Sequence, residues 1–200
     1  MPREITVVQC EDRSGKHLYS VRLLHEFGKS DGYMTPKKVS ELWESARQHD
    51  VLFSDYTEGK VEPFLSVLMN PSSVWLEIFR ETDSKPVGAA YISNVIPRFD
   101  AKGHFAVWDK IAGGREEIFF SIMDWMFLRF GLRRISVEVP AYQSGVIRFS
   151  KRLGFKEEGT KRDGVLHKGV WMPLKLFGIT VEDFERDKKK KVETLEAEIV

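Results

Sequence analysis

A pair of glycines between an apolar segment and a long helix-forming segment is the first place where this sequence could do chemistry. The apolar segment is 104–108, and the helix-forming segment is 116–130. The residues between them that matter are Lys110, Ile111, Ala112, Gly113, Gly114 and Arg115. A helix N-terminus offers backbone N–H groups and a positive dipole end, which a glycine loop lets an anion approach. The pattern predicts a phosphate-binding loop, although two glycines also suit an ordinary strand-to-helix connection.

Two groups able to accept a proton lie on the predicted strands around this loop. Glu138 stands near the end of segment 135–139, and His104 begins the segment that precedes the loop. A carboxylate or an imidazole can take the proton of a reacting amine. Each also has a structural interpretation, as an exposed strand-end carboxylate or as a surface or core histidine. Tyr142 is a further candidate proton donor.

Other kinds of site find no support in residue spacing. Cys10 is the only cysteine, which excludes an intrachain disulfide and a cysteine-based metal cluster. The five histidines show no close metal-ligand spacing. The sequence contains neither a Gly-x-Ser-x-Gly elbow nor a phosphate-binding Gly-Lys-Ser/Thr. We therefore expect no metal site.

The bulk composition describes one globular unit. The chain has 200 residues, of which 42% are hydrophobic and 30% charged, with a net charge of +1. This composition excludes a disordered chain, and the net charge gives no argument for nucleic-acid binding. The N-terminal segment lacks the apolar core of a signal peptide, and no apolar run approaches the ~20 residues of a membrane span. We expect a cytoplasmic protein that does not enter a membrane.

Apolar spacing predicts alternating strands and helices. Strands are expected at 5–10, 73–80, 86–97, 104–108 and 135–139, and helices at 17–27, about 36–48, 63–69, 116–130 and about 146–153. A polar segment and a closing strand near 176–179 follow, then the charge-dense segment 181–200, either a solvated helix or a frayed tail. A strand–helix–strand unit within a mixed sheet fits a layered α/β domain.

The segment 146–180 carries a more specific pattern, a helix ending in Gly-Phe followed by Glu-Gly, Arg-Asp and a late Phe-Gly-Ile. The residues that carry it are Ile147, Arg148, Gly154, Phe155, Glu158, Gly159, Arg162, Asp163, Gly178 and Ile179. This sequence pattern resembles the closing segment of the GCN5-related N-acetyltransferases, and most closely the branch of the ribosomal-protein N-terminal acetyltransferases. The resemblance covers residues 73–180 well and the N-terminal third loosely.

The resemblance implies both a fold and an activity. The fold would be a single α/β domain over residues 1–180, with a central, mixed, mostly antiparallel sheet and helices on both faces. The activity would be transfer of an acetyl group from acetyl-CoA to a primary amine of a protein N-terminus or a small molecule, by direct attack. The family often dimerises, so a homodimer is one option.

The resemblance also implies roles for single residues. The loop from Lys110 to Arg115 would hold the pyrophosphate of coenzyme A. The pantetheine arm would enter where the strand carrying Phe105 and Val107 splays from segment 135–139. Gln143 stands in place of an asparagine that begins the late helix, and Ser150 stands where many members have a tyrosine acid. Glu138 is then the preferred base, with His104 as the alternative.

Two departures from the family pattern keep other interpretations open. Arg115 replaces a small residue of the phosphate loop, and Ser150 replaces the usual tyrosine. Both would suit a catalytically silent domain of this type used for binding or assembly. A third interpretation keeps the fold but changes the donor to another acyl-CoA or to an aminoacyl-tRNA.

Overall fold

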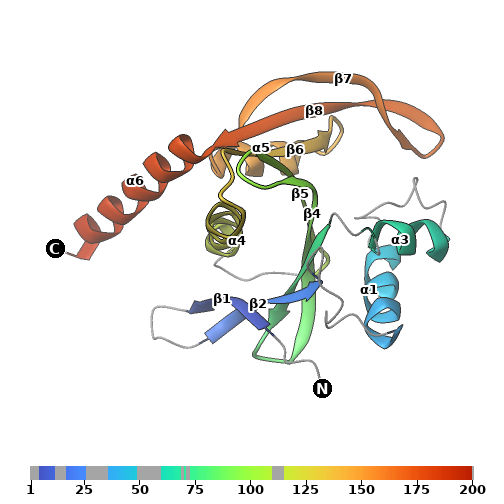
Figure 1. Ribbon diagram of the computed structural model, residues 1–200, viewed down its shortest axis with the longest axis horizontal. Helices are drawn as coiled ribbons and strands as arrows, with labels where there is room; N and C mark the ends of the chain where they lie inside the picture. The colour runs from blue at the N-terminus through green and yellow to red at the C-terminus, as the bar shows by residue number, and fades with distance from the viewer. Residues whose placement is uncertain are drawn as a thin grey trace.

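An eight-stranded sheet forms the centre of the protein (Figure 1). The computed structural model describes residues 5–11, 17–25, 36–48, 60–68, 70, 73–109 and 115–199. The strands are β1 (Ile5–Glu11), β2 (His17–His25), β3 (Val74–Arg80), β4 (Lys85–Ile96), β5 (Asp100–Val107), β6 (Arg134–Pro140), β7 (Lys156–His167) and β8 (Val170–Thr180). They lie in the order β1-β2-β3-β4-β5-β6-β8-β7. Only the β5–β6 pair is parallel among them, so the predicted mixed, mostly antiparallel sheet is confirmed.

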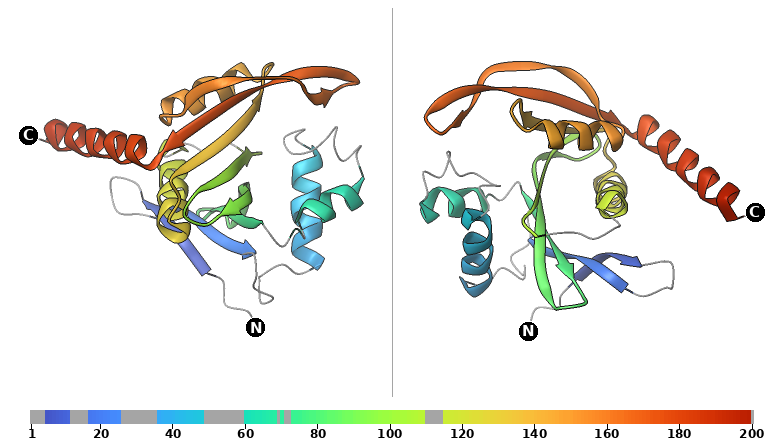
Figure 2. Two further views of the ribbon diagram at one scale, coloured as in Figure 1. Left: turned by 45° about the horizontal axis from the view of Figure 1, so that its top comes forward. Right: turned by 180° about the vertical axis from the view of Figure 1, so that it is seen from behind.

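Helices cover both faces of this sheet (Figure 2). The described helices are α1 (Pro36–Gln48), α3 (Val61–Leu68), α4 (Arg115–Phe130), α5 (Ser144–Arg152) and α6 (Val181–Ile199). Helices α1 and α3 lie on one face, and α4 and α5 lie on the other. We call these the α1 face and the α4 face of the sheet.

The main core lies on the α4 face, because α4 is apolar around most of its circumference. Its buried residues are Ile118, Phe119, Ile122, Met123, Met126, Phe127 and Phe130. A helix of this composition needs cover on several sides. The sheet covers one side, and Phe184 of α6, which is fully buried, covers another with its ring centroid 5.0 Å from that of Phe127.

The segment predicted as a helix over 17–27 is instead strand β2, with residues 26 and 27 outside the described part. Tyr19 and Val21 are buried in the core on the α4 face, whereas Leu24 is buried in the cluster on the α1 face. Strand β2 is paired on both sides, with β1 and β3. A strand covered on both faces loses the simple alternation of apolar and polar residues. Its apolar residues then fell by chance at helical spacing.

The closing hairpin explains two residues of the matched sequence pattern. An ion pair of 2.6 Å between Arg134 on β6 and Glu158 on β7 crosses over β8 at Gly178. A Cβ atom at Gly178 would collide with both side chains. The polar segment after α5 is thus edge strand β7. Gly154 follows the end of α5 with a φ of 92°, as the sequence predicted for the residue that stops this helix.

Candidate functional site

A gap between β5 and β6 is the feature on which the site depends. The two parallel strands pair at three positions only, Asp100 with Arg134, Ala101 with Ile135, and Lys102 with Ser136. The remaining residues of β5, from Gly103 to Val107, stay paired with β4 but form no pair with β6. The splay expected between these strands is therefore present, and it leaves strand edges that a ligand can approach.

Aromatic side chains form the α4 face of this gap. The ring centroid of Phe105 on β5 lies 4.9 Å from that of Phe119 on α4, edge to face. Phe119 in turn lies 5.3 Å from Phe149 on α5. Phe105 and Val107 are both partly buried against the main core. Phe105 is thus packed against α4, and α4 is packed in turn against α5 through the same Phe119 ring.

His104 occupies the α1 face at the point where the strands separate. It continues a row of cross-strand neighbours, Trp75 on β3 and Tyr91 on β4. The ring centroids of Trp75 and Tyr91 are 4.6 Å apart, and those of Tyr91 and His104 are 5.1 Å apart. A hydrogen bond of 3.2 Å joins His104 Nε2 to Ser93 Oγ. The row holds the imidazole in one orientation beside the gap.

Burial and charge keep this imidazole neutral. Desolvation by burial, followed by the positive charge of Lys102, lowers the pKa of His104 from 6.5 to about 4, and Glu138 opposes the shift only in part. A neutral imidazole can donate or accept a hydrogen bond. It holds a proton weakly, so it is a poor acceptor for the proton of an alkylammonium ion. His104 is therefore better suited to orient a substrate than to deprotonate it.

We expect the stability of the protein to fall with acidity because of His104. The folded pKa of about 4 lies below the value of 6.5 for the unfolded chain, so the unfolded state binds the proton first. Stability is full above the unfolded pKa and is lost as the pH falls toward the folded one. Between about pH 7 and about pH 5 the loss should be roughly 2 kcal/mol. Urea unfolding of the parent and of His104→Gln at both pH values measures it, and identical losses in the two proteins would contradict it.

Glu138 lies beside His104 in an ion pair that the sequence did not predict. Its Oε1 atom accepts a hydrogen bond of 2.7 Å from Nζ of Lys102, and the two side chains are 23% and 27% exposed. One step back along the same strands, Ser136 Oγ donates to both carboxylate oxygens of Asp100, at 3.0 and 3.1 Å. Two polar contacts, Ser136 with Asp100 and Lys102 with Glu138, thus join β5 to β6. The second of them lies where the pairing of these strands stops. The available signal for Lys102 was its period-two spacing from His104.

The predicted phosphate-binding loop lies outside the described residues, which omit Lys110, Ile111, Ala112, Gly113 and Gly114. Arg115, which we expected within the loop, is the first residue of α4 and is exposed. The carboxylate of Glu116 beside it accepts a hydrogen bond of 2.9 Å from Arg152 of α5. Residues 108–114 connect the unpaired end of β5 to the N-terminus of α4, so the chain leads from the gap to the free N–H groups of the helix.

The other predicted residues lie on or next to α5. Gln143 precedes the helix, and its side chain makes no capping hydrogen bond. Ser150 is buried within α5, with an exposed fraction of 6%. The Tyr142 ring stacks on His167 of β7, with centroids 4.1 Å apart, which ties the end of β6 to the closing hairpin. None of these contacts joins Gln143 or Ser150 to His104 or Glu138.

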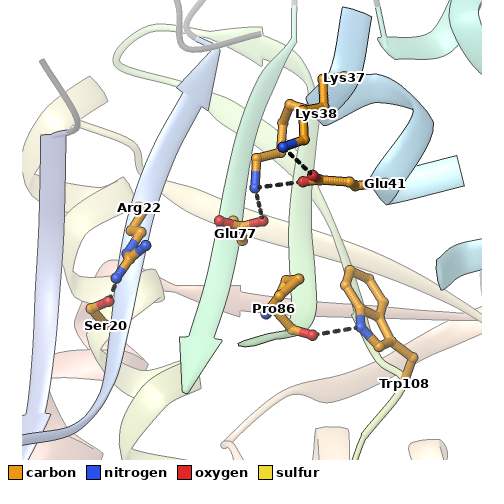
Figure 3. Close-up of polar contacts among 8 residues, drawn as sticks. All are labelled: Ser20, Arg22, Lys37, Lys38, Glu41, Glu77, Pro86 and Trp108. Carbon is orange, nitrogen blue, oxygen red and sulfur yellow. Dashed lines mark hydrogen bonds and ion pairs between the residues drawn. The ribbon is translucent and has the colours of Figure 1, made fainter. Parts of the chain in front are cut away.

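A buried ion pair holds α1 on the same face of the sheet (Figure 3). Nζ of Lys38 lies 2.9 Å from the carboxylate of Glu77 on β3 and 3.3 Å from that of Glu41 on α1. Glu77 is 1% exposed. The contact raises the pKa of Lys38, against the opposing effect of desolvation, which is the largest single contribution. The pair positions the helix that covers the row of aromatic rings, and apolar spacing gave no hint of it.

The described part of the chain offers neither a metal-binding cluster nor a membrane-spanning helix. No group of three or more histidine, cysteine, aspartate or glutamate side chains there could hold a metal ion. None of its helices combines the length and apolar character needed to cross a bilayer.

Solved structures that superpose on this chain include acetyltransferases. A ribosomal-protein-S5-alanine acetyltransferase from Vibrio fischeri superposes with a TM-score of 0.63 at 14% identity, over 88% of this chain and 98% of that one. A spermidine N-acetyltransferase from Vibrio cholerae, in complex with CoA and spermine, gives 0.65 at 12% identity, over 84% and 98%. The protein therefore has the fold of the GCN5-related N-acetyltransferases, over more of the chain than residues 73–180.

Sequence comparison adds one curated relative. The SPbeta prophage-derived N-acetyltransferase YokL of Bacillus subtilis is 29% identical over 73 residues. The match covers 36% of this chain and only 41% of that protein. No protein-family model matches the chain.

Proposed function

We propose that the protein transfers an acetyl group from acetyl-CoA to a primary amine. The observation that carries the proposal is the gap between β5 and β6 next to the N-terminus of α4. An extended amide chain can add to exposed strand edges through backbone hydrogen bonds, and a pyrophosphate suits a helix N-terminus. The pantetheine arm of coenzyme A has amides of this kind, and its nucleotide carries the pyrophosphate. The described residues therefore fit this donor.

The donor side of the site would use the β5 edge and the start of α4. Phe105 and Val107 lie on the part of β5 that does not pair with β6, and Arg115 offers a guanidinium at the start of α4. An arginine of this kind can make a charge-assisted hydrogen bond to a phosphate oxygen. The loop Lys110, Ile111, Ala112, Gly113 and Gly114 would supply backbone N–H groups, as in proteins of this fold.

The acceptor side would use the α1 face of the gap. The nitrogen of a neutral amine attacks the thioester carbonyl carbon, and the carbon–sulfur bond breaks as the tetrahedral intermediate collapses. The amine proton passes to a base, and the departing thiolate takes up a proton from an acid or from water. Glu138 is the base that we propose, with neutral His104 orienting the amine. Gln143 and Ser150 remain candidates for hydrogen bonding to the intermediate and the thiolate.

Direct attack by the amine fits the position of the only cysteine. Cys10 is on β1, at the edge of the sheet, and four strands separate β1 from β6 in the sheet order. An acyl-cysteine intermediate at the gap would need a thiol there. A protein N-terminus or a small amine is the acceptor class that we propose, and the solved structures of this fold include enzymes named for each class.

Titration with acetyl-CoA tests the proposal directly. Calorimetry should show binding, and thiol release should follow when a panel of peptides with free N-termini and of small polyamines is added. Binding without turnover on every amine would favour the silent alternative, and no binding at all would overturn the proposed donor. Propionyl-CoA and an aminoacyl-tRNA in the same assay separate acetyl transfer from the other donor classes.

Replacing Arg115 by alanine should weaken acetyl-CoA binding roughly tenfold, because a charge-assisted hydrogen bond to phosphate would be lost. Arg162→Ala is the matched control, since Arg162 is also an exposed arginine and lies on β7. Calorimetry measures both affinities. Tighter binding by Arg115→Ala would instead mean that this side chain blocks the loop, which would support the silent domain.

A further inference from the structure

The ion pair between Lys102 and Glu138 stands where the pairing of β5 and β6 stops. Nζ of Lys102 on β5 donates to Oε1 of Glu138 on β6, at 2.7 Å. Lys102 is opposite Ser136 in the register, and no later residue of β5 pairs with β6. Both side chains are partly exposed, so each can meet a molecule that enters the gap.

Each member of this pair keeps a hydrogen-bonding group for another partner. An ammonium ion has three N–H donors, and a carboxylate has two acceptor oxygens. Within the part of the chain that the structure describes, the one polar contact of Lys102 Nζ is Glu138, and Oε2 of Glu138 accepts no hydrogen bond. Two donors and one oxygen therefore remain available beside each other at the gap.

No other charged side chain stands on the described strand segments that border the gap. Beyond Lys102, β5 reads GHFAV, and beyond Ser136, β6 reads VEVP. His104 is neutral near pH 7, since burial and then the charge of Lys102 lower its pKa to about 4. These segments therefore present one ammonium and one carboxylate, which are complementary to an acceptor that carries one group of each sign.

Acceptors of other kinds match the pair less well. A polyamine would bring several ammonium groups close to Lys102, and like charges in contact oppose binding. A peptide N-terminus offers only an uncharged amide carbonyl beside its amine. An amino acid carries its amine and its carboxylate on the same carbon atom, so it can reach Glu138 and Lys102 at the same time.

We propose that the acceptor is an amino acid, with a free carboxylate beside the reacting amine, and that Lys102 binds this carboxylate. The inference rests on the proposed acetyl transfer, with Glu138 as the base. The amine lies at Oε2 of Glu138, and the carboxylate accepts charge-assisted hydrogen bonds from the two remaining donors of Lys102. Lys102 is then the residue that selects the acceptor.

The carboxylate has its largest effect during the chemical step. The nitrogen lone pair forms the bond to the thioester carbon, and the amine N–H bond breaks as its proton moves to Glu138. The carbon–sulfur bond breaks with its electron pair leaving on the thiolate, which water protonates. Once protonated, Glu138 no longer balances the charge of Lys102, and a partly buried ammonium without a counter-ion is costly. The substrate carboxylate supplies that counter-ion, so its loss should lower kcat as well as raise KM.

Matched acceptors test the role of the carboxylate. The common amino acids, their amides and spermidine are each assayed with acetyl-CoA. For the preferred amino acid, kcat/KM should exceed that of its amide by about 10-fold or more, as expected for a charge-assisted hydrogen bond. Calorimetry on the complex with CoA should give the same order of affinities. Amides or spermidine that react as well as every amino acid would overturn the proposal.

Lys102→Gln separates carboxylate binding from support of Glu138. The glutamine keeps a donor for Glu138 but has no charge, so the ratio of kcat/KM for the amino acid to that for its amide should fall toward one. Any general loss of activity cancels in this ratio. Lys175→Gln is the control, since Lys175 is also a half-buried lysine, paired with Glu157 at 2.9 Å, and lies on β8. An unchanged ratio in Lys102→Gln would overturn the role of Lys102.

Failure of this inference can be told apart from failure of the proposed function. If no amine were acetylated, acetyl transfer would be wrong, but calorimetry with the amino acids would still test Lys102. Binding that Lys102→Gln weakens about 10-fold or more would support recognition of the carboxylate. The absence of binding by every amino acid would overturn it.

Discussion

Glu138→Gln is expected to lower the turnover number for acetyl transfer by ~100-fold or more, within the range that a general base contributes. The reason is that the amide cannot accept the amine proton, whereas its size and its oxygen are retained. That oxygen can still accept the hydrogen bond from Lys102, now 2.7 Å from Oε1. The position at the mouth of the strand gap, 23% exposed, lets an amine or a bridging water reach the carboxylate.

The effect should be confined to the chemical step. Affinity for acetyl-CoA should stay close to that of the parent, because the proposed donor contacts lie on β5 and α4. Steady-state rates over about pH 6 to 9 with saturating donor measure the change. Glu158→Gln is the matched control, since Glu158 is also paired across strands, at 2.6 Å to Arg134, but lies away from the gap.

If Glu138→Gln turned over like the parent across the pH range, Glu138 would not be the base, and its carboxylate would serve only in the ion pair with Lys102. His104→Gln would then be the next variant. Its pKa of about 4 makes the imidazole a weak base, so we expect its loss to raise KM for the amine more than it lowers kcat.

Phe184→Ala is expected to lower the free energy of unfolding by about 3–5 kcal/mol, the usual cost of removing a buried aromatic side chain. Phe184 is fully buried, and its ring centroid lies 5.6 Å from Phe120 and 5.0 Å from Phe127. The alanine would leave a cavity between α6 and α4. Urea unfolding monitored by tryptophan fluorescence measures the change.

Glu185→Ala is the control for this helix, because Glu185 is exposed and follows Phe184 directly. It should change stability by less than about 0.5 kcal/mol. Equal, small effects of both substitutions would mean that residues from 181 onward form a dispensable tail. A large effect of Phe184→Ala alone would extend the domain past residue 180, which is the boundary expected from the sequence.

Much of the fold was predictable because most elements bury one face only. Helix α1 begins at Pro36, directly after Thr35 in the sequence, α4 ends before Gly131, and a turn at residues 81–84 joins β3 to β4. These signals are local, so a single sequence contains them. One exception is β2, because burial on both faces removes the alternation that identifies a strand. Another is β7, whose first eight residues are polar and mostly exposed.

The sequence predicted only those parts of the candidate site that the family resemblance implies. The resemblance pointed to the strands that splay, and the structure shows where their pairing ends, at Lys102 and Ser136. The partners of Glu138 and His104 were not predictable. Lys102 and Ser93 come from other positions and strands, and their contacts depend on register rather than on local spacing.

The sequence by itself determined the family resemblance, the type of most elements from residue 36 onward and the identity of the groups able to transfer a proton. Only the tertiary structure decided the neighbours of these groups and their protonation states. Register places Tyr91 on β4 next to His104, and burial there lowers the pKa of His104 to about 4. The packing of Phe184 on α4 likewise decided that the charged C-terminal segment starts as part of the core. Both outcomes arise from residues distant in the chain, whose contacts form only when the sheet and its helices close around them.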